Sequence, residues 1–164
     1  MALQLFKIAD VTVGSPVTDV TFSSIPSGYT DLKLVVSART NGTGTPAIGF
    51  YFNGSNANWT GRGLEGSGST AYSFSSTSSN TFTLNTTSQT ANTFASGEFY
   101  VPNYTSSNNK SVSVDGVMEN NATAAYASIL AQLWSSTAAV TSITIVPSSG
   151  SFATNTTATL YGVL

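Results

Sequence analysis

Apolar side chains recur at every second position in several segments of the chain. In the segment 31–39, the residues of one parity are all apolar: Leu32, Leu34, Val36 and Ala38. Successive side chains of a β-strand point to opposite faces of a sheet, so this alternation is typical of a strand with one buried and one wet face. The same period predicts strands at 47–52, 93–101, 110–119, 140–146 and 156–164, shorter strands near 72–74 and 82–84, and a strand-like opening at Leu3.

The segment 124–134 is compatible with two structures. Its alanines and the run 130–133 would suit a helix. We predict a strand, because Tyr126, Ile129 and Trp134 favour strands and the flanking segments are themselves strands. The face that carries Tyr126 and Trp134 is then opposite to the face that carries Ile129.

Turn-forming residues separate the predicted strands. The segments 40–46 and 53–55 contain the Asn-Gly and Gly-rich sequences that reverse a chain. The stretch 55–70 is rich in glycine, and we predict a long surface loop there. Surface loops often carry recognition residues, and this one contains Trp59 and Arg62.

The strands together indicate an all-β protein. A chain of 164 residues suits one domain. Nine Phe, seven Tyr and two Trp supply apolar area that a disordered Ser/Thr-rich tract lacks. We predict a single domain over residues 1–164, an antiparallel jelly-roll-like β-sandwich of about 8–10 strands. The jelly roll is the commonest fold for eight antiparallel strands.

The composition removes most catalytic chemistry. The chain has no histidine and no cysteine, and only 7% of its residues are charged. A nucleophilic serine would need a lysine as its base, and imidazole and thiolate metal ligands are missing. The run 61–66 has the spacing Gly-x-Gly-x-x-Gly, but no helical pattern follows it. We predict that the protein is not an enzyme and holds no cofactor or metal ion.

A glycosidase with paired carboxylates is the enzymatic alternative. Such a pair must lie roughly 5 to 9.5 Å apart. Asp115 and Glu119 share strand parity but would stand roughly 13 Å apart along an extended chain, so they fail as a local pair. For the other carboxylates, the distance along the sequence cannot exclude that two of them form such a pair in the folded chain.

Charge and hydropathy exclude two classes of partner. The net charge is −2, and the five basic residues are scattered instead of forming a stripe that would neutralise phosphates. No run of about 18 apolar residues occurs, and the start of the chain lacks the pattern of a secretory leader. We expect neither nucleic acid nor membrane as a partner, and synthesis in the cytoplasm without a signal peptide.

Four residues are candidates for contact with a glycan or a protein partner. They are Trp59, Arg62, Tyr104 and Trp134. Amphipathic aromatic rings stack on sugars and anchor interfaces because they offer a large contact area at small entropic cost.

Four segments carry a resemblance that spans most of the chain. They are IPSGYTDLKL at 25–34, FYFNGS at 50–55, LWSSTAAVTSITI at 133–145 and ATLYGVL at 158–164. Together they resemble a recurring type of tailed-bacteriophage virion protein. The resemblance implies a small β-sandwich on the particle surface, either as head decoration or as part of a fibre or tail appendage.

We therefore predict a non-enzymatic structural protein of a phage particle that decorates the outer surface of the capsid. Its partners would be the major capsid protein or other virion proteins, and it would form a homo-oligomer, a trimer, through apolar residues on wet faces such as Val35, Tyr51 and Val117. One alternative is a tail-fibre or baseplate domain that binds host glycans. A free carbohydrate-binding module is a third possibility.

Overall fold

The computed structural model describes residues 4–121 and 124–164, and these residues form an all-β fold. Their twelve strands are β1 (Leu5–Thr12), β2 (Val20–Phe22), β3 (Asp31–Ala38), β4 (Ala47–Phe52), β5 (Trp59–Gly66), β6 (Ala71–Ser76), β7 (Asn80–Thr83), β8 (Ala95–Val101), β9 (Lys110–Met118), β10 (Tyr126–Trp134), β11 (Ile143–Pro147) and β12 (Thr157–Val163). Leu3, where we expected the first strand to open, lies outside the described residues. Within the described part of the chain, no helix is long and apolar enough to cross a membrane.

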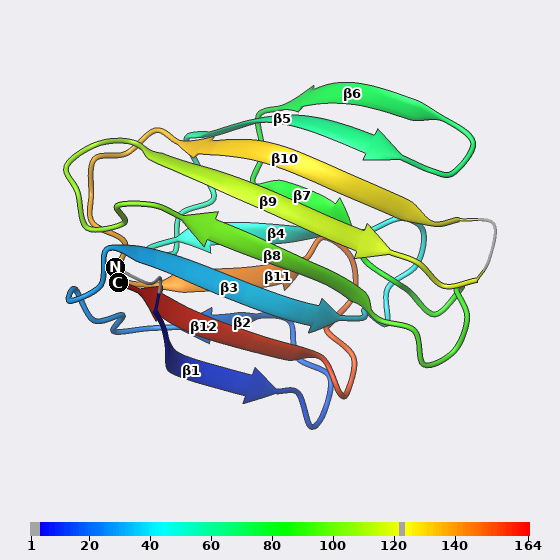
Figure 1. The fold of residues 1–164 in the computed structure, drawn as a ribbon. Helices are drawn as coiled ribbons and strands as arrows, with labels where there is room; N and C mark the ends of the chain where they lie inside the picture. Colours follow the sequence, from blue (N-terminus) through cyan, green and yellow to red (C-terminus); the bar gives the residue numbers. More distant parts are fainter. Residues whose placement is uncertain (1–3, 122–123) are drawn as a thin grey trace.

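The strands form two antiparallel sheets that pack face to face (Figure 1). The large sheet has eight strands in the order β1-β12-β3-β8-β9-β10-β5-β6, and the small sheet has four in the order β2-β11-β4-β7. The small sheet lies behind the lower and middle strands of the large sheet in Figure 1, whereas β5 and β6 extend beyond it. The β-sandwich predicted from the alternating pattern is confirmed.

The order of the strands is that of a jelly roll. Four strands of the large sheet follow one another in the order β1-β12-β3-β8, and the small sheet has the order β2-β11-β4-β7. Along these eight strands the chain passes repeatedly from one sheet to the other, as in two Greek keys. The remaining strands are two insertions, β5–β6 between β4 and β7, and β9–β10 between β8 and β11. These insertions raise the number of strands above the eight to ten that we predicted.

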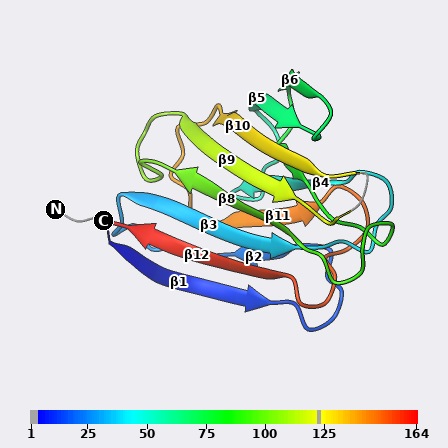
Figure 2. The same ribbon diagram turned by 45° about the vertical axis from the view of Figure 1, so that its right-hand side comes forward.

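The two ends of the described chain lie side by side (Figure 2). The Gln4 amide donates to the Leu164 carbonyl over 3.4 Å, and the Leu164 amide donates to the Gln4 carbonyl over 3.2 Å. This pair continues the antiparallel pairing of β1 with β12. The first and last strands of the chain are therefore neighbours at one edge of the large sheet.

The prediction of a surface loop over 55–70 was wrong, because β5 occupies the middle half of this stretch. Inward and outward positions alternate along β5, but two of the inward positions are glycines, Gly61 and Gly63. A Cβ atom at Gly63 would overlap the ring of Phe74, and one at Gly61 would lie 2.8 Å from the Gln132 side chain. Neighbouring strands fill the space that an apolar residue of β5 would otherwise occupy.

The strand prediction for 124–134 is confirmed. β10 pairs with β9 on one side and with β5 on the other, without a register shift. A residue between two strands satisfies its backbone groups through both neighbours, so strand pairing outweighs the weak helical preference of the alanines.

Aromatic rings fill the core between the sheets. Phe50 of the small sheet stacks on Phe99 of the large sheet with ring centroids 4.4 Å apart and an interplanar angle of 10°. Phe52 packs edge-on against Trp134, with centroids 5.4 Å apart. Burial of such large side chains is the main contribution to the stability of this fold.

Candidate interaction surface

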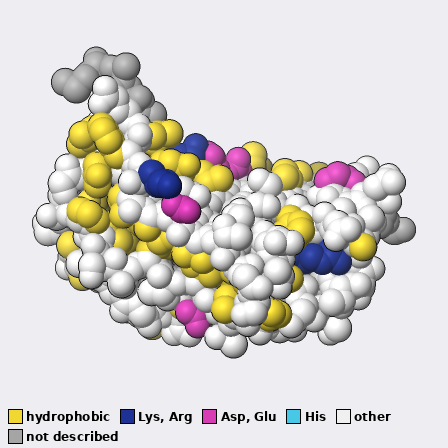
Figure 3. All heavy atoms as spheres, turned by 90° about the horizontal axis from the view of Figure 1, so that it is seen from below, with side chains coloured by type: hydrophobic (Ala, Val, Ile, Leu, Met, Phe, Trp, Pro, Cys, Tyr) yellow, Lys and Arg dark blue, Asp and Glu magenta, His cyan; other side chains and the backbone are white. Residues whose placement is uncertain are grey.

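Charged side chains are few and scattered on the surface (Figure 3). The candidate interaction surface is instead the outer face of the large sheet, where apolar side chains are exposed. Ile129 of β10 and Leu64 of β5 are 68% and 63% exposed. They are direct cross-strand partners, so their side chains project next to each other. Adjacent exposed apolar residues mark interaction sites more strongly than isolated ones do.

The apolar surface continues along β10 and onto β9. Val117 is 49% exposed and pairs with Ala127. Ala127 and Ala131 lie two residues before and after Ile129 and therefore on the same face. We call this set the outer apolar patch; its members are Leu64, Val117, Ala127, Ile129 and Ala131.

A shallow depression of about 520 Å³ joins the outer apolar patch to β6. Its lining comes from three strands and includes Arg62, Leu64, Ser73, Ser75, Ile129 and Ala131. Arg62 pairs with Ala131 across the strands and is exposed, with its guanidinium bonded to the Gly61 carbonyl over 2.8 Å. Arg62, a contact candidate from the sequence, therefore lies at the rim of the patch.

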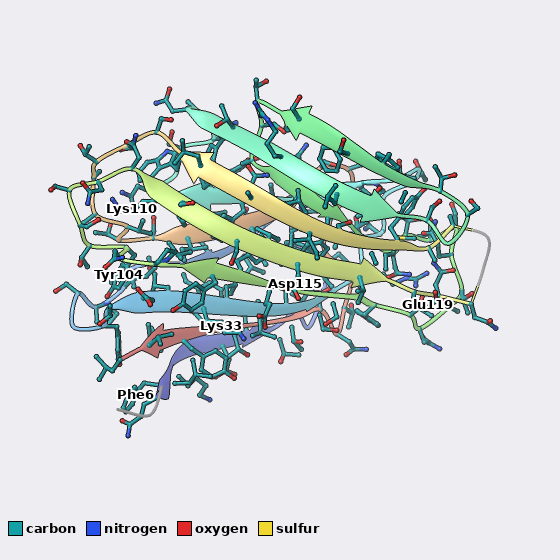
Figure 4. All side chains as sticks on the ribbon, turned by 45° about the horizontal axis from the view of Figure 1, so that its top comes forward. Phe6, Lys33, Tyr104, Lys110, Asp115 and Glu119 are labelled. Carbon is teal, nitrogen blue, oxygen red and sulfur yellow. The ribbon has the colours of Figure 1, made fainter. Side chains whose placement is uncertain are left out.

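Charged residues border the patch toward the middle of the sheet (Figure 4). Asp115 of β9 is the cross-strand partner of Ile129 on one side and of Glu98 on the other. Lys33 forms a 2.6 Å ion pair with Glu98. An apolar contact with a polar rim is the usual anatomy of a protein interface.

The three aromatic candidates lie in the core, which corrects the prediction that their rings contact a ligand. Trp59, Tyr104 and Trp134 are 2%, 0% and 4% exposed. Trp59 and Trp134 face each other across β5 and β10, with centroids 6.4 Å apart. The Tyr104 hydroxyl donates a hydrogen bond to the Pro26 carbonyl. Of the four candidates for glycan or partner contact, only Arg62 is on the surface.

One buried carboxylate connects the inserted strands on their inner face. Glu65 of β5 is 9% exposed, and its Oε2 accepts a 2.7 Å hydrogen bond from the Ser128 hydroxyl of β10. Its Oε1 accepts a hydrogen bond from the Tyr72 hydroxyl of β6. This hydrogen bond, together with burial and the Glu65 charge, raises the pKa of Tyr72 to about 12. Glu65 thus holds three neighbouring strands together.

Lys110 is a buried cation without an ion pair in the described structure. Ser107 and Lys110 have the Ser-x-x-Lys spacing found in some serine enzymes. The Lys110 ammonium, however, donates to the carbonyls of Ser106 and Asn108 at 2.7 and 2.5 Å. Burial lowers the pKa of Lys110. These contacts make Lys110 a support for the loop between β8 and β9.

Comparisons of the chain with family models, with curated proteins and with solved structures found no match. In the described residues, no three His, Cys, Asp or Glu side chains gather where they could hold a metal ion. The outer apolar patch is therefore the feature on which a functional interpretation can be built.

The sequence contained only part of the signal for this patch. The strand prediction for 124–134 put Ile129 on the face opposite to Tyr126 and Trp134 but did not say which face is outward; the structure shows that the face of Ile129 is the outer one. Val117 was expected on a wet face, which its 49% exposure agrees with. Leu64 was assigned to a loop, and only the pairing of β5 with β10 brings it next to Ile129.

Proposed function

We propose that the protein is a non-enzymatic structural component of a bacteriophage particle and that it decorates the outer capsid surface. It attaches by burying the outer apolar patch against the major capsid protein. The observation that carries this proposal is the adjacency of Leu64 and Ile129, which are 63% and 68% exposed. The resemblance of the sequence to phage virion proteins supplies the choice of particle.

The physical character of the patch supports attachment to a protein surface. Fully burying a Leu or Ile side chain contributes roughly 1.5–3 kcal/mol. Arg62 and Asp115 at the rim allow hydrogen bonding around the apolar centre. Since the patch itself carries no charge, attachment should depend only weakly on salt.

The tail-fibre alternative has less support. It relied on exposed aromatic rings such as Trp59, which is 2% exposed. A free carbohydrate-binding module would need the same rings. The outer apolar patch contains no aromatic ring that could stack on a sugar, so it supports neither alternative.

Electron microscopy of particles tests the proposal. We expect density for the protein on the outer capsid surface, with the large sheet facing the shell. Density at the tail, or no density on the particle, would contradict the proposal.

Variants then test the patch itself. Ile129→Ser and Leu64→Ser should each weaken retention on the capsid roughly tenfold or more, because each removes about 1.5–3 kcal/mol of apolar burial. Val35→Ser is the matched control, since Val35 is also exposed on the outer face but lies on β3, outside the patch. Equal loss from all three variants would show that the patch is not the contact.

A further inference from the structure

The two sheets have four edge strands, and three of them resist pairing with another chain. β1 carries a register shift and the 2.7 Å ion pair between Lys7 and Asp10. β2 has only three residues, and β7 has four residues and a register shift where it pairs with β4. Charges, irregular register and short length are the means by which proteins block edge-to-edge association.

The fourth edge strand, β6, has none of these features. It has six residues, pairs with β5 in regular register, and contains no charged residue and no proline. Tyr72 on β6 is 45% exposed. A regular, uncharged edge of this length is a template for a further strand.

The hydrogen bonding of the β5–β6 hairpin shows which backbone groups of β6 are free. The Ser67 amide donates to the Thr70 carbonyl over 2.9 Å, so these two residues form a hydrogen-bonded pair. Such pairs alternate along an antiparallel ladder. Tyr72, Phe74 and Ser76 therefore bond to β5, whereas Ala71, Ser73 and Ser75 direct their amide and carbonyl groups outward.

We propose that β6 pairs with β6 of a second copy of this chain, antiparallel and around a two-fold axis at Ser73. In this register Ser73 lies opposite the partner's Ser73, and Ala71 lies opposite the partner's Ser75. These are the residues whose backbone groups point outward, so the contact forms a hydrogen-bonded ladder across the axis. The two large sheets become one continuous sheet.

The side chains of β6 fit a second copy in this register. Tyr72 comes opposite the partner's Phe74 on the inner face, and the symmetry repeats this pair on the other side of the axis. Cross-strand aromatic pairs stabilise sheets, and Tyr72 and Phe74 already lie with ring centroids 6.2 Å apart within one chain. On the outer face only serine and alanine meet, and no like charges face each other at the axis.

The contact leaves the outer apolar patch free. A two-fold axis that relates antiparallel strands within a sheet is perpendicular to that sheet, so both patches face the same side of the dimer. This inference does not rest on the proposed attachment to a capsid and can fail or succeed without it. It replaces the trimer expected from the sequence with an isologous dimer.

Light scattering of the purified full-length protein at tens of micromolar tests the assembly. We expect twice the chain mass. Ser73→Lys should raise the dimer dissociation constant at least tenfold, because the new charge meets its own copy at the axis. Ser113→Lys is the control, since Ser113 is also exposed on the outer face but lies on β9.

Two further variants separate loss of contact from loss of folding. Ser73→Lys and Ser73→Glu should each be monomeric alone and should form a heterodimer when mixed. Ser73→Cys should form a disulfide between two copies on mild oxidation, since opposed residues of a hydrogen-bonded pair have Cα atoms about 5.5 Å apart. The natural chain contains no cysteine that would compete.

Several results would overturn the proposal. A wild-type monomer or trimer would do so directly. A dimer that persists unchanged in Ser73→Lys, or a mixture of the Lys and Glu variants that stays monomeric, would show that β6 is not the contact.

Discussion

The Ser128 hydroxyl donates a 2.7 Å hydrogen bond to Glu65 Oε2 across the boundary between the two inserted hairpins. Glu65 also accepts a hydrogen bond from Tyr72, so one carboxylate joins β10, β5 and β6. β6 has no fully buried residue of its own. Glu65 therefore adds a side-chain contact to the backbone pairing with β5 and to the packing of Phe74, which together hold this edge strand.

Replacement of Glu65 should loosen the β5–β6 hairpin. Glu65→Ala leaves Ser128 buried without its acceptor, and hydrogen bonds to a charged group contribute about 1.5–3 kcal/mol. We expect a loss of about 2 kcal/mol in the free energy of unfolding, measured by urea denaturation. Glu119→Ala is the control, because Glu119 is exposed and, among the described residues, its carboxylate accepts hydrogen bonds from the amides of Asn120 and Asn121. Equal stability of the two variants would contradict the role given to Glu65.

Two tyrosines should make the fold sensitive to alkali. A hydrogen bond to Asp31, followed by burial and the Asp31 charge, raises the pKa of Tyr100 to about 12, and Glu65 raises that of Tyr72 to the same value. The unfolded chain releases these protons near pH 10. The stability from both groups is therefore complete below pH 10 and is lost as pH rises from about 10 to about 12.

This sensitivity is measured by melting temperature and tyrosinate absorbance across that pH range. Tyr72→Phe and Tyr100→Phe should each remove one late-titrating tyrosine and flatten the fall in melting temperature. A titration in which both tyrosines ionise near pH 10 would contradict the prediction.

Arg39 fixes the loop between β7 and β8. Its guanidinium donates at 2.5 to 3.2 Å to four backbone carbonyls, those of Thr86, Gln89, Thr90 and Thr93. Lysine has a single compact ammonium and cannot span this set. We expect Arg39→Lys to destabilise the fold by about 2 kcal/mol and to expose residues 86–93 to limited proteolysis.

Arg62→Lys is the matched control for Arg39. Arg62 is exposed, and its guanidinium bonds to the carbonyl of the neighbouring Gly61. This variant should leave both the unfolding free energy and the proteolytic pattern unchanged. A stable, protease-resistant Arg39→Lys variant would show that the loop is held by other contacts.

Gly116 provides room for a core ring. Gly116 and Gly97 are cross-strand partners on β9 and β8, and a Cβ atom on either would overlap the ring of Phe82. Gly116→Ala should therefore cost about 1–3 kcal/mol, as overpacking does elsewhere. Gly66→Ala is the control, because nothing lies within 4 Å of its Cβ position. Thermal unfolding of the two variants measures the difference, and equal melting temperatures would contradict it.

The sequence alone determined most of the strands. Alternation between two faces is a local property of a strand, and burial alternates in this way along β3, β9 and β10. It also indicated a wet face on β9, where Val117 was expected outside the core. The jelly-roll sandwich followed from the number of strands and the turns between them.

Only the tertiary structure shows which side chains cover the inner face of β5 and which strands lie beside it. Gly61 and Gly63 occupy inward positions because Gln132 and Phe74 reach into that space from adjacent strands. A pattern based on apolar residues cannot detect a core position that holds glycine.

The register between strands decided the candidate site. The pairing of β5 with β10 buries Trp59 against Trp134 and, on the opposite face, places Leu64 beside Ile129. The sequence determines which residues share a face of one strand, because side chains alternate with a period of two. Which faces meet across strands, and which edge of a sheet stays unpaired, depends on contacts between distant segments, and only the folded chain determines these.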